Sequence, residues 1–465
     1  MKHPGRSTLT QAALVAAWVA LATGIACLRT DDPLEHLASG SSPSGAGASA
    51  VTGSSGSGVA ASSNAGGKAS GGQATGGSDP SVLGGASDGG ADTGPNWPAD
   101  FGCGDAPVSS EPFSQPALRG AAADCALWHY CRFEGGATQL EYELNEYVEA
   151  PSATTLARAQ SSYAQAMSLW SVIEPFRVGP GASSSDDEHH GKGLSSLIYV
   201  WPEVDRCRVE EQVAMQGYVT NIDGVFTSAR GLFALDYLLH YPGSDTVCLA
   251  SKASAKKWAT LSEDEIGALK RQYAGALGAD LVARTSALRN LWAADGGNFR
   301  QKFVDLTGYP DQDTAMTILA WSLLYIEIEL KDYKLGVPLG LTLKSPVTIQ
   351  ESAYSGRLTE NLRANLRGFR ALFQGCGPEG EGLGFDDWLV EAGHGELAQD
   401  IVTAWQGAQA AADQYPRFDQ ASPAQLQSLY ASIKVLTDLL KGDLFAGDGS
   451  PLSFDLPMGI GDDTD

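Results

Sequence analysis

Apolar residues recur along much of the chain at the spacing of an α-helix. A stripe of apolar side chains three or four positions apart predicts a helix with one buried face. Three such stripes are Tyr163, Met167, Trp170 and Ile173; Tyr273, Leu277, Leu281, Leu288 and Trp292; and Leu426, Tyr430, Ile433 and Leu440. They predict helices over about 156–176, 264–293 and 422–440.

Further signals support the same fold class. Segment 313–330 is apolar on nearly all sides, which predicts a buried helix with Asp313 as its N-cap. Ser422 and Pro423 form a typical helix start. Alternating strand patterns are rare, and 341–349 is the best candidate for a strand. The pattern therefore predicts an all-α fold of packed helical bundles.

The first hundred residues have a different character. Residues 1–26 resemble an export signal, with Lys2 and Arg6 before an apolar run that ends in "GIAC". Cleavage before Cys27 would leave a cysteine to carry a lipid, as in a bacterial lipoprotein; ordinary secretion after cleavage behind Ala26 is the alternative. Residues 27–100 are rich in Ser, Gly and Ala and predict a disordered, flexible tether. A folded domain over 101–455 and an acidic tail over 456–465 follow.

Composition narrows the partners. The net charge of the 465-residue chain is −24, which disfavours nucleic acid because phosphate binding needs a basic surface. The predicted partners are a membrane, contacted through the N-terminal lipid anchor in the periplasm or at the outer membrane, and an unknown small ligand or cation.

The cysteines suggest disulfides. Besides Cys27 there are six cysteines, an even number that is typical of exported proteins. Predicted helices over 209–219 and 231–241 would form an antiparallel hairpin whose ends bring Cys207 to Cys248. Cys125 is near enough to Cys131 to pair with it, which would leave Cys103 for Cys376. This pairing ranks first among the fifteen that six cysteines allow.

An ordered series of motifs resembles the imelysin family of bacterial extracytoplasmic proteins, which includes insulin-cleaving-peptidase-like and iron-regulated members. The motifs are "WSVIEPFRVGP" (170–180), "YVWPEVDRCRVEEQV" (199–213), "GLFALDYLLH" (231–240) and "IQESAYSGRLTENLRANLRGFRALFQG" (349–375). The resemblance implies an all-helical fold of two packed halves, roughly 120–250 and 260–455. It also implies a candidate site near their junction, a lipoprotein setting and a loose link to iron uptake.

The chain departs from the family pattern at its G-x-H-x-x-E motif. The histidine of that motif falls on Phe233 and the glutamate on Asp236. Asp236 and His240 stand four residues apart and could contact one ion, but His240 is more simply explained as a charged cap of its helix end. A catalytic zinc ion usually needs three protein ligands. We therefore expect no catalytic residues, no cofactor and no tightly held metal, with Asp236 satisfied by hydrogen bonds or an arginine.

The resemblance and the pattern together define a candidate binding cleft. Glu174 is expected either to pair with Arg177 or Arg206 or to face a ligand, and Glu351 with Ser352 either to cap a helix or to form a polar wall. The candidate residues are Glu174, Arg177, Trp201, Phe233, Asp236, His240, Glu351 and Ser352. The function that fits best is a non-catalytic, ligand-binding lipoprotein linked to iron or cation uptake. The alternatives are a metallopeptidase with a relocated site and a purely structural surface protein.

Overall fold

The computed structural model describes residues 97–182, 191–342, 350–415, 417–445, 450–454 and 456–457. The predicted signal peptide, Cys27, nearly all of the tether and most of the acidic tail lie outside these residues. All regular elements of the described residues are helices, so the all-α prediction is confirmed. The candidate strand at 341–349 lies outside them except for its first two residues.

The described helices belong to one compact unit, which spans Ala91–Asp465. The α-helices are α1 (Gln115–Glu149), α2 (Ala153–Ile173), α3 (Leu194–Ile198), α4 (Arg206–Met215), α5 (Gly217–Thr220), α6 (Gly231–His240), α7 (Ala253–Trp258), α8 (Glu263–Trp292), α9 (Phe299–Val304), α10 (Gln312–Trp321), α11 (Leu358–Phe373), α12 (Phe385–Glu391), α13 (Gly395–Asp413) and α14 (Pro423–Leu439). Two π-helices, η7 (Ile326–Gly336) and η9 (Leu440–Leu444), complete the list of longer elements. None of the described helices is long and apolar enough to cross a membrane.

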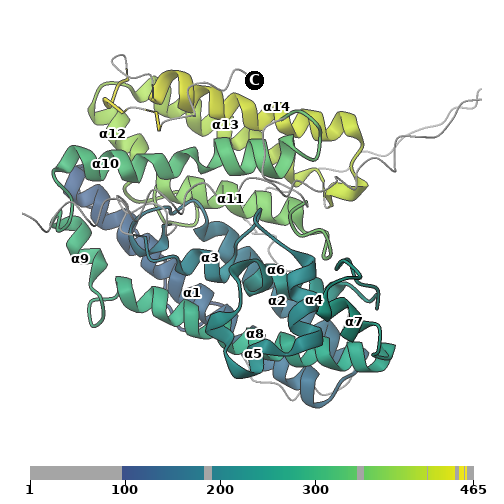
Figure 1. Ribbon diagram of the computed structural model, residues 1–465. Coiled ribbons are helices and arrows are strands. Elements are labelled where there is room, and N and C mark those ends of the chain that lie inside the picture. Colours follow the sequence, from purple (N-terminus) through teal and green to yellow (C-terminus); the bar gives the residue numbers. More distant parts are fainter. Residues whose placement is uncertain are drawn as a thin grey trace, which may run out of the picture. The chain divides into compact units, whose positions relative to one another are not determined.

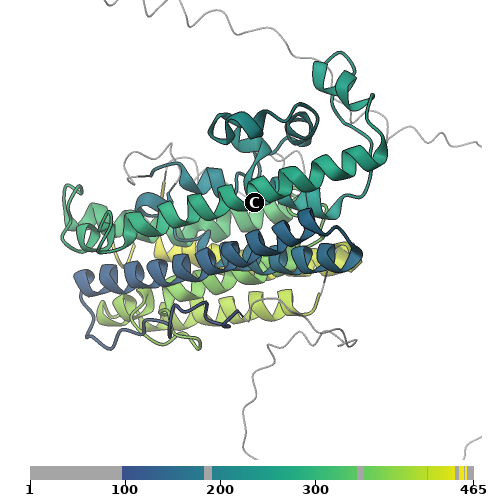
Figure 2. The ribbon, with the colours of Figure 1, turned by 90° about the horizontal axis from the view of Figure 1, so that it is seen from below.

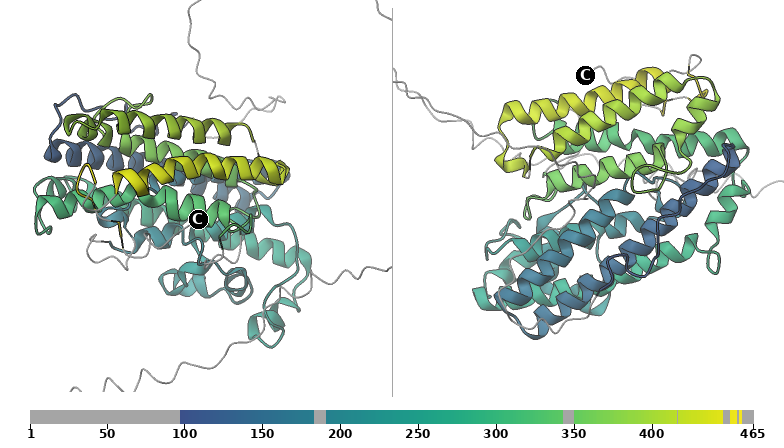
Figure 3. Two further views of the ribbon diagram at one scale, coloured as in Figure 1. Left: turned by 90° about the horizontal axis from the view of Figure 1, so that it is seen from above. Right: turned by 180° about the vertical axis from the view of Figure 1, so that it is seen from behind.

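Two groups of long helices share the core. Helix α1 packs against both α2 and α8, and α13 packs against α14 and α11 (Figure 1). Helix α11 also packs along α2, and so connects the groups. Seen from below, α7 stands off from α1 and α2 (Figure 2), and the view from behind shows α1 and α2 side by side (Figure 3). The predicted division into two halves, roughly 120–250 and 260–455, stays a prediction.

The predicted helices lie where the structure has helices, but some of their ends and caps differ. The helix expected over 313–330 begins one residue earlier and ends at Trp321, with Asp311 rather than Asp313 as its N-cap. The Oδ1 atom of Asp311 accepts a hydrogen bond from the Thr314 N–H at 2.8 Å. Beyond it the chain tightens into a short 3₁₀ turn and then forms η7. This change of winding determines which side chains of 326–336 face the core.

Three disulfides link the described residues. Cys207 is bonded to Cys248, the pair that the hairpin argument predicts. The other two pairs differ from the prediction, because Cys103 bonds Cys131 and Cys125 bonds Cys376. Cys125 and Cys131 are six positions apart on α1, and a rigid helix keeps residues at that spacing on different faces. Three disulfides indicate an exported protein.

Candidate functional site

Helix α6 carries the residues at the family motif and is buried along almost its whole length. Gly231 opens it with φ +66°, and a Cβ atom there would lie 2.2 Å from the carbonyl oxygen of Ile198. Glycine thus allows α6 to start directly against the end of α3. Phe233 and Asp236 are 5% and 2% exposed. Phe233 is part of the apolar core, as its side chain predicts.

Asp236 is held by backbone donors. Its Oδ2 atom accepts a hydrogen bond from the Tyr354 N–H and its Oδ1 atom one from the Ser355 N–H, each at 3.2 Å. Burial raises the pKa of Asp236, and the bonds from Ser355 and Tyr354 oppose that rise. Hydrogen bonds therefore satisfy this carboxylate, and the segment after Glu351 is fixed against α6.

His240 stands at the end of α6, next to Asp236. Its Nδ1 atom lies 3.1 Å from the backbone oxygen of Asp236 and 3.7 Å from Oδ1 of the same residue. Burial lowers the pKa of His240, although the Asp236 carboxylate raises it. An imidazole that donates from Nδ1 to the carbonyl oxygen fits this geometry, and the predicted charge on His240 stays a prediction.

A buried lysine unites two of the predicted acids. The Nζ atom of Lys334, on η7, lies 2.9 Å from Oε2 of Glu174 and 2.7 Å from Oε1 of Glu351. It also donates to Oδ1 of Asn365 at 2.9 Å, and the Tyr199 hydroxyl donates to Glu351 at 3.2 Å. Glu174 thus pairs with Lys334. Arg177 donates to the backbone oxygen of Glu174, and Arg206 pairs with Glu210.

Charge is balanced unevenly in this group. Burial alone would lower the pKa of Lys334, but Glu174 and Glu351 raise it well above its ordinary value, so the ammonium group persists. Burial raises the pKa of Glu351, and Lys334 opposes that rise. One cation faces two acids, and Oε2 of Glu351 has no hydrogen-bond partner among the described residues. A proton on Glu351 would make the group neutral.

Glu351 and Ser352 do not cap a helix. They lie in a turn, with Ser352 at φ +51°, and α11 begins only at Leu358 without a side-chain cap. The Ser352 hydroxyl instead accepts a hydrogen bond from the Asn361 amide at 3.0 Å. The N-cap interpretation of this pair is therefore wrong.

A pocket opens beside the lysine group. It has a volume of about 490 Å³ and is walled by the end of α2, by α3 and the segment after it, and by one face of η7. Its lining includes Glu174, Arg177, Tyr199, Trp201, Glu203, Glu329 and Tyr333. Arg177 lies 3.3 Å from Glu329 across it, with the two side chains 40% and 23% exposed.

The structure brings together only part of the predicted cleft. Glu174, Arg177 and Trp201 line the pocket, and Glu351 lies behind it on Lys334. The α6 residues Phe233, Asp236 and His240 are not in its lining, and Ser352 is buried in its turn.

Sequence reasoning missed several residues of this region. Lys334 is the lysine that binds both acids, and Glu329 and Tyr333 line the pocket. The available signal was a run of charged residues, "EIELKDYK", within an otherwise apolar helical segment. Charges at such positions indicate buried pairs or a site.

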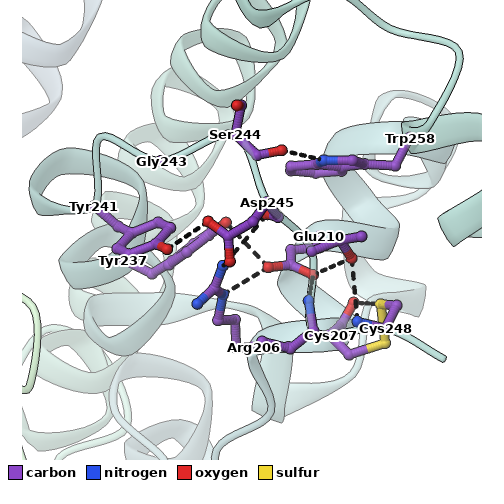
Figure 4. Close-up of polar contacts among 12 residues, drawn as sticks. Arg206, Cys207, Glu210, Tyr237, Tyr241, Gly243, Ser244, Asp245, Cys248 and Trp258 are labelled. Atoms are coloured by element: carbon purple, nitrogen blue, oxygen red, sulfur yellow. Dashed lines mark hydrogen bonds and ion pairs between the residues drawn. A yellow bond between two sulfur atoms is a disulfide. The ribbon is translucent and has the colours of Figure 1, made fainter.

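A second polar cluster next to α6 is structural. Glu210, on α4, is 1% exposed and accepts hydrogen bonds from Arg206 at 2.6 Å and from the Tyr237 hydroxyl at 3.2 Å. It also accepts from the Thr246 hydroxyl and the Val247 N–H, at 2.6 and 3.0 Å. Figure 4 shows this cluster beside the Cys207–Cys248 disulfide. The protein's own donors use Glu210 fully, so it is no ligand site.

Known proteins resemble this chain in sequence and in fold. The family model Peptidase_M75, described as Imelysin, matches residues 126–441, and the chain belongs to the imelysin family. Iron-regulated protein A of Synechococcus elongatus is 25% identical over 290 residues, which is 61% of this chain and 71% of that protein.

Two solved structures share the fold. An imelysin-like protein from Psychrobacter arcticum has a TM-score of 0.54 and 16% identity, covering 76% of this chain and all of that one. An iron-regulated protein A precursor from Parabacteroides distasonis has a TM-score of 0.51 and 14% identity, covering 72% of this chain and 96% of that one.

The residues at the family motif do not fit a tightly held metal ion. Phe233 offers no ligand atom, both oxygens of Asp236 accept backbone hydrogen bonds, and the nearby acids hold Lys334. Within the described part of the chain, two sets of at least three potential metal ligands lie close together. Each contains both cysteines of a disulfide, and neither lies on α6.

Proposed function

We propose that the protein is an extracytoplasmic, lipid-anchored binding protein without a catalytic role. Its ligand is a small, positively charged molecule or metal chelate, and its role is in the acquisition of iron or another cation. The observation that carries this proposal is the pocket of about 490 Å³ with the Glu329 carboxylate in its wall.

The charges of the lining support a cationic ligand. Three acids, Glu174, Glu203 and Glu329, face one lining cation, Arg177. Lys334 already neutralises Glu174, and the Arg177–Glu329 contact of 3.3 Å is partly exposed and therefore weak. Glu329 thus remains available to a stronger partner.

The shape and aromatic content of the pocket support a small molecule. Pockets for small ligands usually measure a few hundred cubic ångströms. Trp201 and Tyr333 line this one, and aromatic faces attract cations. A ligand with an amine could place its charge at Glu329 and its body against these rings.

The context supports a role in cation acquisition at a membrane. Two similar proteins are named for regulation by iron, and one of them is called a precursor. The sequence places a lipid-modifiable Cys27 behind an export signal. A lipid anchor of two or more acyl chains on Cys27, followed by a long tether, would keep the domain near the membrane surface.

The experiment is calorimetric titration of the full-length protein with a ferric trihydroxamate chelate that carries a free amine. Binding is expected, with a rise in melting temperature as the chelate concentration exceeds Kd. The N-acetylated, uncharged chelate should bind at least about tenfold more weakly if an ion pair of about 1.4 kcal/mol is lost. Equal affinity for both chelates would contradict the charge requirement.

Variants locate the site. Glu329→Gln should weaken binding of the amine chelate at least about tenfold by the same reasoning. Glu391→Gln, at an exposed position of α12, is the matched control and should bind as the wild type does. Chelator-sensitive peptide cleavage by the wild type would overturn the non-catalytic assignment, and failure of the chelate to bind would overturn the ligand class.

A further inference from the structure

Two cysteines and a glutamate lie together at the start of α4, away from the pocket. Cys207 and Glu211 are four residues apart, so they share one face of the helix. Cys248 reaches them from the segment that follows α6 (Figure 4). One potential ligand atom from each of the three residues lies within 4.8 Å of the others.

A lysine ammonium group already contacts this cluster. The Nζ atom of Lys252 lies 2.8 Å from Oε1 of Glu211 and 3.4 Å from the Sγ atom of Cys207. The Ser254 hydroxyl reaches the same Glu211 oxygen at 3.4 Å. The Lys252 side chain is 41% exposed, so it can turn into solvent and leave its position to another cation.

We propose that reduction of the Cys207–Cys248 disulfide creates a binding site for a thiophilic divalent cation of the Zn²⁺ class. A dithiol reductant would deliver two electrons and two protons to the disulfide and become a disulfide itself. Each of the two new thiols then loses its proton when it binds the metal. Two thiolates and the Glu211 carboxylate supply three ligands, and water completes a tetrahedral set.

The charges favour this outcome. Two thiolates and one carboxylate carry three negative charges, of which a divalent cation neutralises two. Lys252 is close enough to balance the third from the edge of the site. In the oxidised protein the sulfur atoms carry no charge, so the ammonium group of Lys252 alone balances the Glu211 carboxylate.

The other close set, Cys125, His129 and Cys376, is less suited to a cation. Its residues are 1%, 8% and 8% exposed. The positively charged side chains of Arg132 and Arg367 act on His129 electrostatically. The two guanidinium groups would repel a metal ion that enters this buried set. This set therefore serves as the internal comparison in the test.

The test titrates the full-length protein with Co²⁺, a spectroscopic substitute for Zn²⁺, before and after treatment with a phosphine reductant. Peptide mapping by mass spectrometry identifies which cysteines the treatment opens. Once Cys207 and Cys248 are open, we expect thiolate-to-cobalt absorption that saturates at one equivalent and disappears when Zn²⁺ is added. The oxidised protein should show none.

Two variants decide where the metal binds. Glu211→Gln should weaken Co²⁺ binding at least about tenfold, whereas His129→Gln should leave it unchanged. Absorption that depends on His129 would overturn the proposal. Equal absorption in the wild type and Glu211→Gln would also overturn it, because an unfolded reduced chain that binds through its thiols alone would give that result. A disulfide that stays closed in the folded protein, or open thiols without absorption, would also overturn it. None of these outcomes bears on ligand binding at the Glu329 pocket.

Discussion

The ammonium nitrogen of Lys334 lies 2.7 Å from Oε1 of Glu351, and neither side chain is exposed to solvent. The same nitrogen lies 2.9 Å from Glu174 at the end of α2. A residue of η7 thus joins the N-terminal helices to the turn before α11. The contact places a cation of the protein itself between two buried acids.

Lys334→Met should destabilise the protein by about 3–5 kcal/mol, because it leaves two buried carboxylates without their cation. The free energy of unfolding, measured by urea denaturation at pH 7, checks this value. The loss should shrink as the pH falls, since protonation removes the unpaired charges.

A double variant tests the mechanism of that loss. Lys334→Met combined with Glu351→Gln should be less destabilised than the sum of the two single variants, because one of the stranded charges is then absent. Strict additivity would show that Lys334 contributes through packing rather than through its charge.

The fold was accessible from the sequence because helical periodicity and start signals are local. Ser422 and Pro423 start α14 as predicted, and Ser422 accepts a hydrogen bond from the Gln425 N–H at 3.4 Å. Helix α1 escaped the periodicity argument, since alanine and glycine form much of its buried face together with polar residues such as Arg119 and His129. Small residues give a weak pattern even where packing is tight.

The site was less accessible because its partners are distant in the sequence. Glu174 and Lys334 are 160 residues apart. Sequence reasoning therefore assigned Glu174 to the nearby Arg177 or Arg206. The family resemblance located Asp236, but only the structure shows that the backbone of 354–355 occupies both of its oxygens.

His129 should make the protein sensitive to acid. Burial, with the charges of Arg132 and Arg367, lowers the pKa of His129 to about 3. In the unfolded chain its pKa is near the ordinary 6.5, so below that pH the unfolded state binds a proton that the folded state does not. The free energy of unfolding should therefore fall as the pH drops from 6.5 towards 3, by up to about 1.4 kcal/mol per pH unit from this residue.

The variant His129→Gln removes that contribution. Between pH 6.5 and 3, the slope of its free energy of unfolding against pH should be smaller by up to about 1.4 kcal/mol per pH unit, which is the effect of one proton. His394→Gln, at an exposed position, is the control and should keep the wild-type slope. An unchanged slope in His129→Gln would show that this histidine is protonated in the folded protein.

The proposed membrane attachment through Cys27 can be tested by substitution. Cys27→Ser should move the exported protein from the membrane fraction to the soluble fraction, because the lipid acceptor is lost. Ser39→Ala, in the same tether, should leave the distribution unchanged. Equal solubility of the wild type and Cys27→Ser would refute the lipoprotein assignment.

Restoring the family motif should give α6 a higher affinity for metal ions. Phe233→His with Asp236→Glu places a nitrogen and a carboxylate ligand three residues apart on α6, a spacing that can hold one ion. Calorimetric titration with Zn²⁺ should show affinity in the double variant that exceeds that of the wild type. Phe233→Leu, which adds no ligand, should not gain it.

The metal content of the purified, oxidised protein tests the central claim most directly. Because Lys334 and backbone donors engage the acids near α6, elemental analysis of full-length protein prepared without chelators or reductants should find no stoichiometric zinc or iron. One metal ion per chain, lost in Asp236→Ala or His240→Ala, would contradict the account. It would show that His240 had taken the role of the missing histidine.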